Sequence, residues 1–171
     1  MLKAAGALLI LSGCAVWSAG GVLRLRSRKR ILARLAASLN LMESEICDRQ
    51  APLPEVVRQL AGTADGPVKV FYTEVYRQLQ GTDGRTFAEM WRRAILRTPD
   101  MMLTPEEEYA FSQLGFSLGK YDAAYQKNAI ALTRKKMALY AKTAREECER
   151  DWKVQAFVGM AAGLAAVIVL L

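Results

Sequence analysis

Histidine is absent from this sequence of 171 residues, and cysteine occurs only three times. Without histidine, the chain lacks the commonest general base and the commonest protein ligand of metal ions. The three cysteines, Cys14, Cys47 and Cys148, have no paired spacing, which excludes a disulfide framework and fits a reducing cytosol. A thiol nucleophile would have no imidazole partner. We therefore expect no catalytic residue, no metal and no cofactor, and the sequence does not predict an enzyme.

Two long stretches of the chain lack charged residues. Positions 4–23 carry no charge, and neither do positions 154–171, where Gln155 is the only strongly polar residue. A helix of about 20 residues is roughly 30 Å long, which matches the hydrocarbon thickness of a bilayer. We predict an N-terminal transmembrane helix at 1–23, a helical domain at 24–153 and a C-terminal transmembrane helix at 154–171. A buried core helix is the soluble alternative for the last segment.

Basic residues lie on one side of each predicted span. Only Lys3 precedes the first span, and Arg150 and Lys153 come just before the second. Five basic residues follow the first span at once: Arg24, Arg26, Arg28, Lys29 and Arg30. Because basic flanks stay on the cytoplasmic side, we expect a bacterial membrane protein whose central domain is cytoplasmic.

The net charge of +7 raises the question of nucleic-acid binding. Much of the excess lies in the basic cluster at 24–30, next to the first predicted span, where anionic lipid headgroups account for it. Aromatic residues, which favour single-strand binding, do not alternate with these charges. We do not expect a nucleic acid as a partner.

The residues between the two spans have the periodicity of helices. One apolar stripe repeats at alternating intervals of four and three residues: Leu35, Leu39, Met42 and Ile46. Glu43, Glu45 and Arg49 lie off this stripe. Alternation with a period of two is missing, and 68–72 is the only short candidate for a strand. The pattern predicts an all-α fold, a cytoplasmic bundle of about five or six helices between the two transmembrane helices.

Helix boundaries are marked by two capping boxes. Thr86 with Glu89 has this form, and so does Thr104 with Glu107, where proline follows at the first helical position. From 122 to 171 there is neither proline nor a glycine pair to stop a helix. We therefore predict one long helix that leaves the bundle and enters the bilayer.

Gly115 to Lys120 is similar to a phosphate-binding loop at first sight. One residue is missing between its glycines, Tyr121 replaces the required Ser or Thr, and no strand precedes it. Gly119 is better explained as the end of a helix.

Leu11 to Cys14 matches the pattern at which bacterial lipoproteins are cleaved and acylated. The apolar run continues after Cys14, and five positive charges then follow, which would resist export. A lipoprotein, or an extracytoplasmic membrane-anchored binding module, therefore stays as the alternative to a cytoplasmic platform.

The second predicted span contains Gly159 and Gly163, four positions apart. This spacing lets helix backbones approach closely in lipid. The packing partner would be the first span or another subunit, including a second copy of the chain. Ordinary glycine content of a membrane helix is the alternative.

The layout resembles the stage III sporulation protein AB family of endospore-forming bacteria, over nearly the whole chain. The matching pieces are Met1–Ile10, Leu39–Ile46, Pro52-Leu53-Pro54 with Glu55 and Val56, Phe87–Trp91, and Leu118-Gly119 followed by Asp122 and Gln126. Lys120-Tyr121 departs from the small or polar pair expected there, which concerns the local turn alone. The first helices also look like the cytoplasmic domains of type II secretion and type IV pilus platform proteins.

This resemblance implies a non-enzymatic platform subunit of the sporulation channel between mother cell and forespore. The protein would lie in the mother-cell membrane facing the forespore. Its partners would be a secretion-type ATPase (stage III sporulation protein AA) and other membrane subunits of the channel. Arg134, Lys135 and Lys136 are candidates for meeting an acidic face of a partner, and a solvated helix surface is the alternative.

Overall fold

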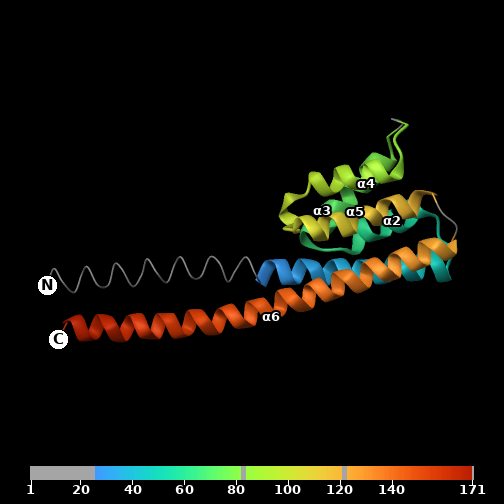
Figure 1. Cartoon of the computed structure of the whole chain (residues 1–171). Coiled ribbons are helices and arrows are strands. Elements are labelled where there is room, and N and C mark those ends of the chain that lie inside the picture. The colour runs from blue at the N-terminus through green and yellow to red at the C-terminus, as the bar shows by residue number, and fades with distance from the viewer. Residues whose placement is uncertain (1–25, 82–83, 121–122, 171) are drawn as a thin grey trace. The chain divides into compact units, whose positions relative to one another are not determined.

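All regular secondary structure in the described part of the chain is helical. The computed structural model describes residues 26–81, 84–120 and 123–170, and it describes side chains in these ranges except at 119, 120, 123 and 151–170. In chain order, the elements are a first helix at 26–43, a π-helical turn η1 (Ser44–Asp48), α2 (Leu53–Thr63), α3 (Gly66–Leu79), α4 (Phe87–Leu96), a 3-10 turn η2 (Pro99–Met101), α5 (Pro105–Lys120) and α6 (Ala123–Leu170) (Figure 1). The all-α prediction is confirmed, and residues 68–72 lie inside α3.

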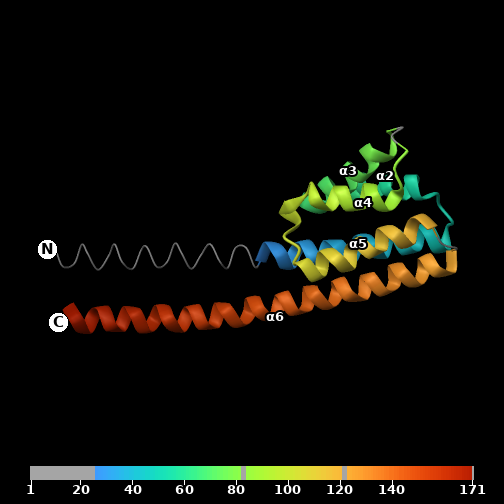
Figure 2. The same ribbon diagram turned by 45° about the horizontal axis from the view of Figure 1, so that its top comes forward.

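The chain divides into two compact units. The larger unit is Arg30–Ala141, in which α2 packs on α3, α3 on α4, and α4 on α5 (Figures 1 and 2). The described residues of the smaller unit are 26–29 and 142–170. Within the smaller unit, Arg28 Nη1 lies 3.6 Å from Glu147 Oε2. Cys148 is half-buried there.

Length and apolarity together decide whether a helix can cross a bilayer. Among the residues that the structure describes in full, no helix meets both requirements. Both predicted spans fall elsewhere: residues 1–23 lie outside the described residues, and the side chains of 154–171 do too.

Aromatic rings from three helices form the centre of the larger unit. Phe71 and Tyr72 of α3, Trp91 of α4 and Phe111 of α5 are all fully buried. The ring centroid of Trp91 lies 4.8 Å from that of Phe71 and 5.0 Å from that of Phe111. Such tilted and edge-on pairs stabilise a core by about 0.5–1.5 kcal/mol each beyond their buried area. The cluster joins α3, α4 and α5 in one core.

A glycine lets Trp91 approach the backbone of α5. A Cβ atom built on Gly115 would lie 2.7 Å from Trp91 Cγ, closer than real Cβ atoms come to a neighbour. The indole Nε1–H donates to the carbonyl oxygen of Phe111 at 2.9 Å, so the buried polar atom of the ring has its partner. Gly115 therefore serves packing, which is why it stands inside α5 although glycine weakens helices.

The first helix buries the stripe that the sequence indicated. Leu35, Leu39 and Met42 are fully buried. Ser38 Oγ donates to the Leu35 carbonyl at 2.8 Å, which leaves Tyr72 to donate its hydroxyl hydrogen to Ser38 Oγ across 2.9 Å. Burial raises the pKa of the Tyr72 phenol, so this buried donor stays protonated. The first helix is thereby joined to α3.

The first helix ends in a π turn that the sequence did not reveal. At Ser44–Asp48 the helix widens, and a π turn adds one residue to a helical turn. Glu45, predicted to lie off the apolar stripe, is 6% exposed in the structure. Its carboxylate accepts hydrogen bonds from Arg49 at 3.0 Å and from Gln59 of α2 at 3.4 Å. The altered register explains the difference, because it directs Glu45 towards α2.

Both predicted capping boxes are present. Thr86 Oγ1 accepts from the Glu89 N–H, and the Glu89 carboxylate accepts from the Thr86 N–H at 3.0 Å. Thr104 and Glu107 make the same exchange at the start of α5, where the Thr104 N–H lies 2.8 Å from the Glu107 carboxylate. These bonds satisfy donors that the first turn of a helix leaves without a partner.

Replacing Gly115 by alanine tests the close approach of Trp91. The added methyl group must displace the indole, so the free energy of unfolding should fall by about 1–3 kcal/mol. Gly62→Ala in α2 is the matched control, because a methyl group added there would have no atom within 4 Å. Urea unfolding followed by tryptophan fluorescence should show the control unchanged or stabilised by up to about 1 kcal/mol. Equal stability of G115A and the wild type would contradict this packing.

Candidate functional site

The Pro52-Leu53-Pro54 segment shapes the start of α2. Pro52 is the N-cap residue with an extended backbone, and its carbonyl accepts from the N–H groups of Glu55 and Val56. Pro52 and Pro54 are exposed, whereas Leu53 is half-buried. The two prolines suit the first turn of a helix, where a missing N–H is tolerated.

The second family motif closes the turn between α5 and α6. Gln126 Nε2 donates to the Leu118 carbonyl at 3.2 Å, and Leu118 itself is buried. Gly119 lies in the last turn of α5. Asp122 lies outside the described residues. The structure thus brings Leu118 and Gln126 together and gives them a local structural role.

The three basic residues proposed for a partner separate into two groups. Arg134 Nε donates to Glu43 at 2.9 Å, so its charge already has an intramolecular partner. Lys135 and Lys136 are exposed. Gly159 and Gly163 lie in the C-terminal part of α6, outside the region where side chains are described.

One face of α6 combines exposed apolar and basic side chains. Leu132 is 56% exposed and Leu139 is 61% exposed. Lys135 and Lys136 fall between them, so the four residues have the spacing i, i+3, i+4 and i+7 that places side chains on one helix face. We call these four residues the α6 face.

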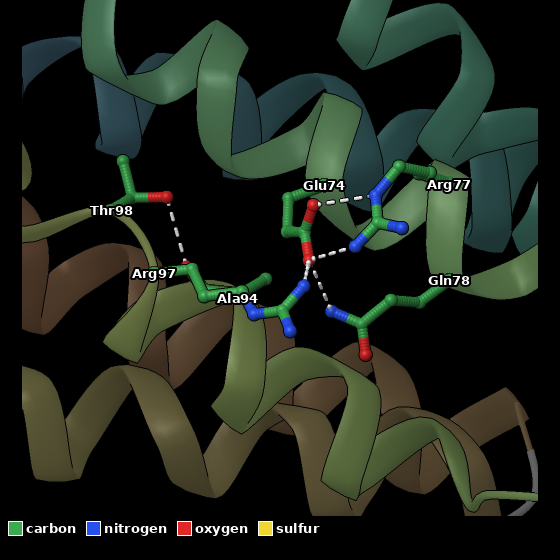
Figure 3. A network of polar contacts seen from close by, with 6 residues as sticks. All are labelled: Glu74, Arg77, Gln78, Ala94, Arg97 and Thr98. Carbon is green, nitrogen blue, oxygen red and sulfur yellow. Dashed lines mark hydrogen bonds and ion pairs between the residues drawn. The ribbon is translucent and has the colours of Figure 1, made fainter.

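A second polar cluster lies where α3 meets the end of α4. Glu74 Oε1 accepts from Arg77 Nη2 and Arg97 Nη1, each at 2.7 Å, and from Gln78 Nε2 at 3.0 Å (Figure 3). Glu74 Oε2 accepts from Arg77 Nε at 2.8 Å. The Arg77 contact is the two-pronged pair that a guanidinium forms with a carboxylate. Arg97 joins the network from the residue after α4, so Glu74 ties the two helices together.

The surrounding donors change the acidity of Glu74. Hydrogen bonding by Arg77, followed by that of Arg97, lowers the pKa of the Glu74 carboxyl from 4.5 to about 2, although partial burial opposes the shift. The carboxylate is therefore ionised at every physiological pH. It functions as a fixed negative charge that holds two arginines in place.

Two hollows border this network. The first, about 320 Å³, exposes mainly the apolar atoms of its lining side chains, and we call it the apolar hollow. Its described lining consists of Lys69, Val70, Thr73, Glu74, Arg77, Arg97 and Thr98. The second, about 390 Å³, is mainly polar, and we call it the arginine hollow. Its described lining consists of Arg77, Gln78, Gly81, Arg85, Arg93 and Arg97. Arg77 and Arg97 border both hollows.

Gln78 contributes a buried acceptor to the arginine hollow. The side chain is 8% exposed, and its Nε2 is used by Glu74. Its Oε1 is buried and has no hydrogen-bond partner. Figure 3 shows this oxygen directed away from Glu74. Buried polar atoms are normally paired, so an acceptor of this kind in a lining calls for an explanation.

Sequence reasoning did not find the arginine hollow. The spacing of Glu74 and Arg77 suggests a local ion pair on a helix, but Arg97 joins this pair, and Arg93 reaches the hollow beside it, only through the packing of α3 on α4. A metal site was not expected, and the described residues contain no group of three or more cysteine and acidic side chains that could hold a metal ion.

The low pKa of Glu74 predicts how stability depends on pH. A depressed folded-state pKa adds stability that is present above the unfolded value of 4.5 and is lost as pH falls towards 2. Urea unfolding measures this effect as a change in the free energy of unfolding between about pH 6 and pH 2. With allowance for screening by solvent, this free energy should fall by about 2 kcal/mol more in the wild type than in Glu74→Gln. Glu55→Gln is the control, because the Glu55–Arg58 pair is exposed and contributes little. Parallel pH profiles of E74Q and wild type would contradict the prediction.

The comparisons with known proteins agree on one family. The family model for stage III sporulation protein AB matches residues 3–171. Stage III sporulation protein AB of Bacillus subtilis (strain 168) is 26% identical over 174 residues, which cover all of both chains. A solved structure of stage III sporulation protein AB has the same fold, with a TM-score of 0.66 and 23% identity over 72% of this chain and 97% of that chain. The chain belongs to the stage III sporulation protein AB family.

Proposed function

We propose that the protein is a non-enzymatic platform subunit of the sporulation channel between mother cell and forespore, and that its helical domain docks a secretion-type ATPase in the cytoplasm. Membership of a sporulation family supports the setting. The transmembrane helices at 1–23 and 154–171 belong to this proposal, with the protein in the mother-cell membrane facing the forespore. The ATPase would be stage III sporulation protein AA, and other channel subunits would assemble beside it.

The α6 face carries the docking part of this proposal. Leu132 and Leu139 expose more than half of their surface, although leucine side chains gain free energy by burial. The spacing of the four residues matches the way a helix face presents anchors to a partner. Lys135 and Lys136 would add attraction to an acidic surface. Arg134 is not part of this face in the proposal, because it already pairs with Glu43.

Attachment to a membrane would help such docking. Confinement raises the effective concentration of neighbouring subunits, so that a modest contact is sufficient for assembly. Lys135 and Lys136 would mainly accelerate encounter and select an acidic partner, whereas the two leucines would provide buried area. The platform would then transmit movements of the ATPase to the channel through contacts between helices.

The double variant Leu132→Ser with Leu139→Ser tests the α6 face. Full-length protein in detergent should capture the purified ATPase, and the variant should bind at least about tenfold more weakly because two apolar anchors are lost. Tyr109→Ser on α5 is the matched control, since Tyr109 is 68% exposed and lies on another helix. The charge-reversal pair Lys135→Glu and Lys136→Glu should slow association and remove its salt dependence.

Two outcomes would count against the docking surface. Capture that is unchanged in L132S/L139S would exclude the α6 face. An equal loss in Y109S would point to unspecific hydrophobic adsorption instead. Far-ultraviolet circular dichroism of each variant shows whether the helical domain is intact, so a folding defect is not mistaken for lost binding.

Labelling of Cys47 and Cys148 tests the cytoplasmic placement against the lipoprotein alternative. In a Cys14→Ser background, a membrane-impermeant thiol reagent should label the protein after lysis and not in intact cells. Burial raises the pKa of the Cys47 thiol, so a mildly alkaline buffer is used to supply thiolate. Labelling in intact cells would invert the topology. The intact mass would then show whether the unaltered chain of 18.9 kDa is cleaved and acylated at Cys14.

A further inference from the structure

The arginine hollow gathers one sign of charge from two helices and the loop between them. Arg77 lies in α3, Arg93 in the last turn of α4, and Arg97 follows α4 directly. With Arg85, which already has a partner of its own, they give four arginines among the six described lining residues, and no carboxylate is among those six. Like charges at close range repel one another, so a site of this kind favours an anion. Glu74 compensates Arg77 and Arg97 from the side of the apolar hollow.

A simple anion would not use everything that the hollow offers. The Gln78 carbonyl oxygen is an acceptor, and it is buried in the lining without a hydrogen-bond partner. It needs an N–H or O–H donor, which a carboxylate lacks. A peptide supplies a carboxylate and an N–H donor close together, since each acidic side chain is attached to a backbone that carries N–H groups.

The apolar hollow extends the same surface. It shares Arg77 and Arg97 with the arginine hollow, and its lining includes Val70, which is 55% exposed. A peptide whose acidic residue lies in one hollow can therefore place a neighbouring apolar side chain in the other. Arginine is well suited to binding an acidic segment, because its planar guanidinium group can donate two hydrogen bonds to one carboxylate. Arginine is also enriched at protein interfaces.

We propose that the arginine hollow, together with the apolar hollow beside it, binds an acidic segment of a partner protein in which an apolar residue neighbours a glutamate or aspartate. The carboxylate is held by the arginines, among them Arg93, which lies outside the Glu74 network. A peptide N–H of the segment donates to Gln78. The proposal rests on the docking function above for the presence of a protein partner, and it assigns this partner a second surface, distinct from the α6 face.

The experiment compares Arg93→Glu with Arg92→Glu. Both arginines are exposed neighbours on α4 and both variants change the charge equally, but only Arg93 lines the hollow. The probe is a short acetylated and amidated peptide of alternating glutamate and leucine, titrated calorimetrically into full-length protein in a neutral detergent. A peptide with glutamine in place of glutamate is the uncharged control. Neither variant touches Glu74, so the network between α3 and α4 stays intact.

The expected result is binding of the acidic peptide that weakens at least about tenfold in R93E and less than about twofold in R92E. Binding should also weaken as salt is raised, because charge attraction is screened. Equal weakening in both variants would overturn the proposal, since it would mean unspecific attraction to basic helices. Equal binding of the glutamine peptide would overturn it too. Arg93-dependent binding of phosphatidylglycerol vesicles without peptide binding would assign the hollow to lipid headgroups and overturn it likewise.

ATPase capture separates this inference from the docking function. If R93E loses the peptide while ATPase capture still depends on Leu132 and Leu139, both surfaces stand. If no peptide binds but capture depends on the α6 face, the inference fails and the docking function stands. If the peptide binds through Arg93 but ATPase capture does not depend on Leu132 and Leu139, the α6 face is excluded as the docking surface and the inference about the hollow stands.

Discussion

The close approach of Trp91 to the backbone of α5 is the contact on which the helical domain depends. The indole touches α3 through Phe71 and α5 through Phe111, and Gly115 leaves the space that it occupies. Burial of so large a side chain is strongly favourable, and the hydrogen bond to the Phe111 carbonyl removes the cost of burying its N–H. Because three helices meet at this ring, the spacing of α3 and α4 follows from it. That spacing in turn positions Glu74 opposite Arg97.

The sequence predicted those parts of the fold that depend on local patterns. The stripe from Leu35 to Met42 and both capping boxes were found, because helical periodicity and the pairing of Thr with Glu three residues later act within one element. The π turn was missed, since helical periodicity does not show where one turn takes in an extra residue. The arginine hollow was missed for a different reason: Arg77 and Arg93 lie on different helices, and they meet only because α3 packs on α4.

Arginine has two different roles in this protein. Arg134 holds Glu43 and joins the first helix to α6, so its charge serves the fold. Arg77 and Arg97 also pair with a carboxylate, but three contacts converge on one oxygen of Glu74 and leave both guanidinium groups bordering open space. A single anionic charge thereby organises a surface of opposite sign. Charge counts taken from the sequence cannot distinguish these roles, because the +7 excess contains both kinds of residue.

The π turn at Ser44–Asp48 has a consequence for where the chain tolerates a change in length. Each residue of a helix turns the chain by about 100°, so deleting one residue here would restore ordinary helical geometry and rotate all earlier side chains relative to α2. Glu45 would lose its place beside Gln59, and the leucine stripe would no longer face the interior. A change of one residue at this turn would therefore alter which side of the first helix faces α2.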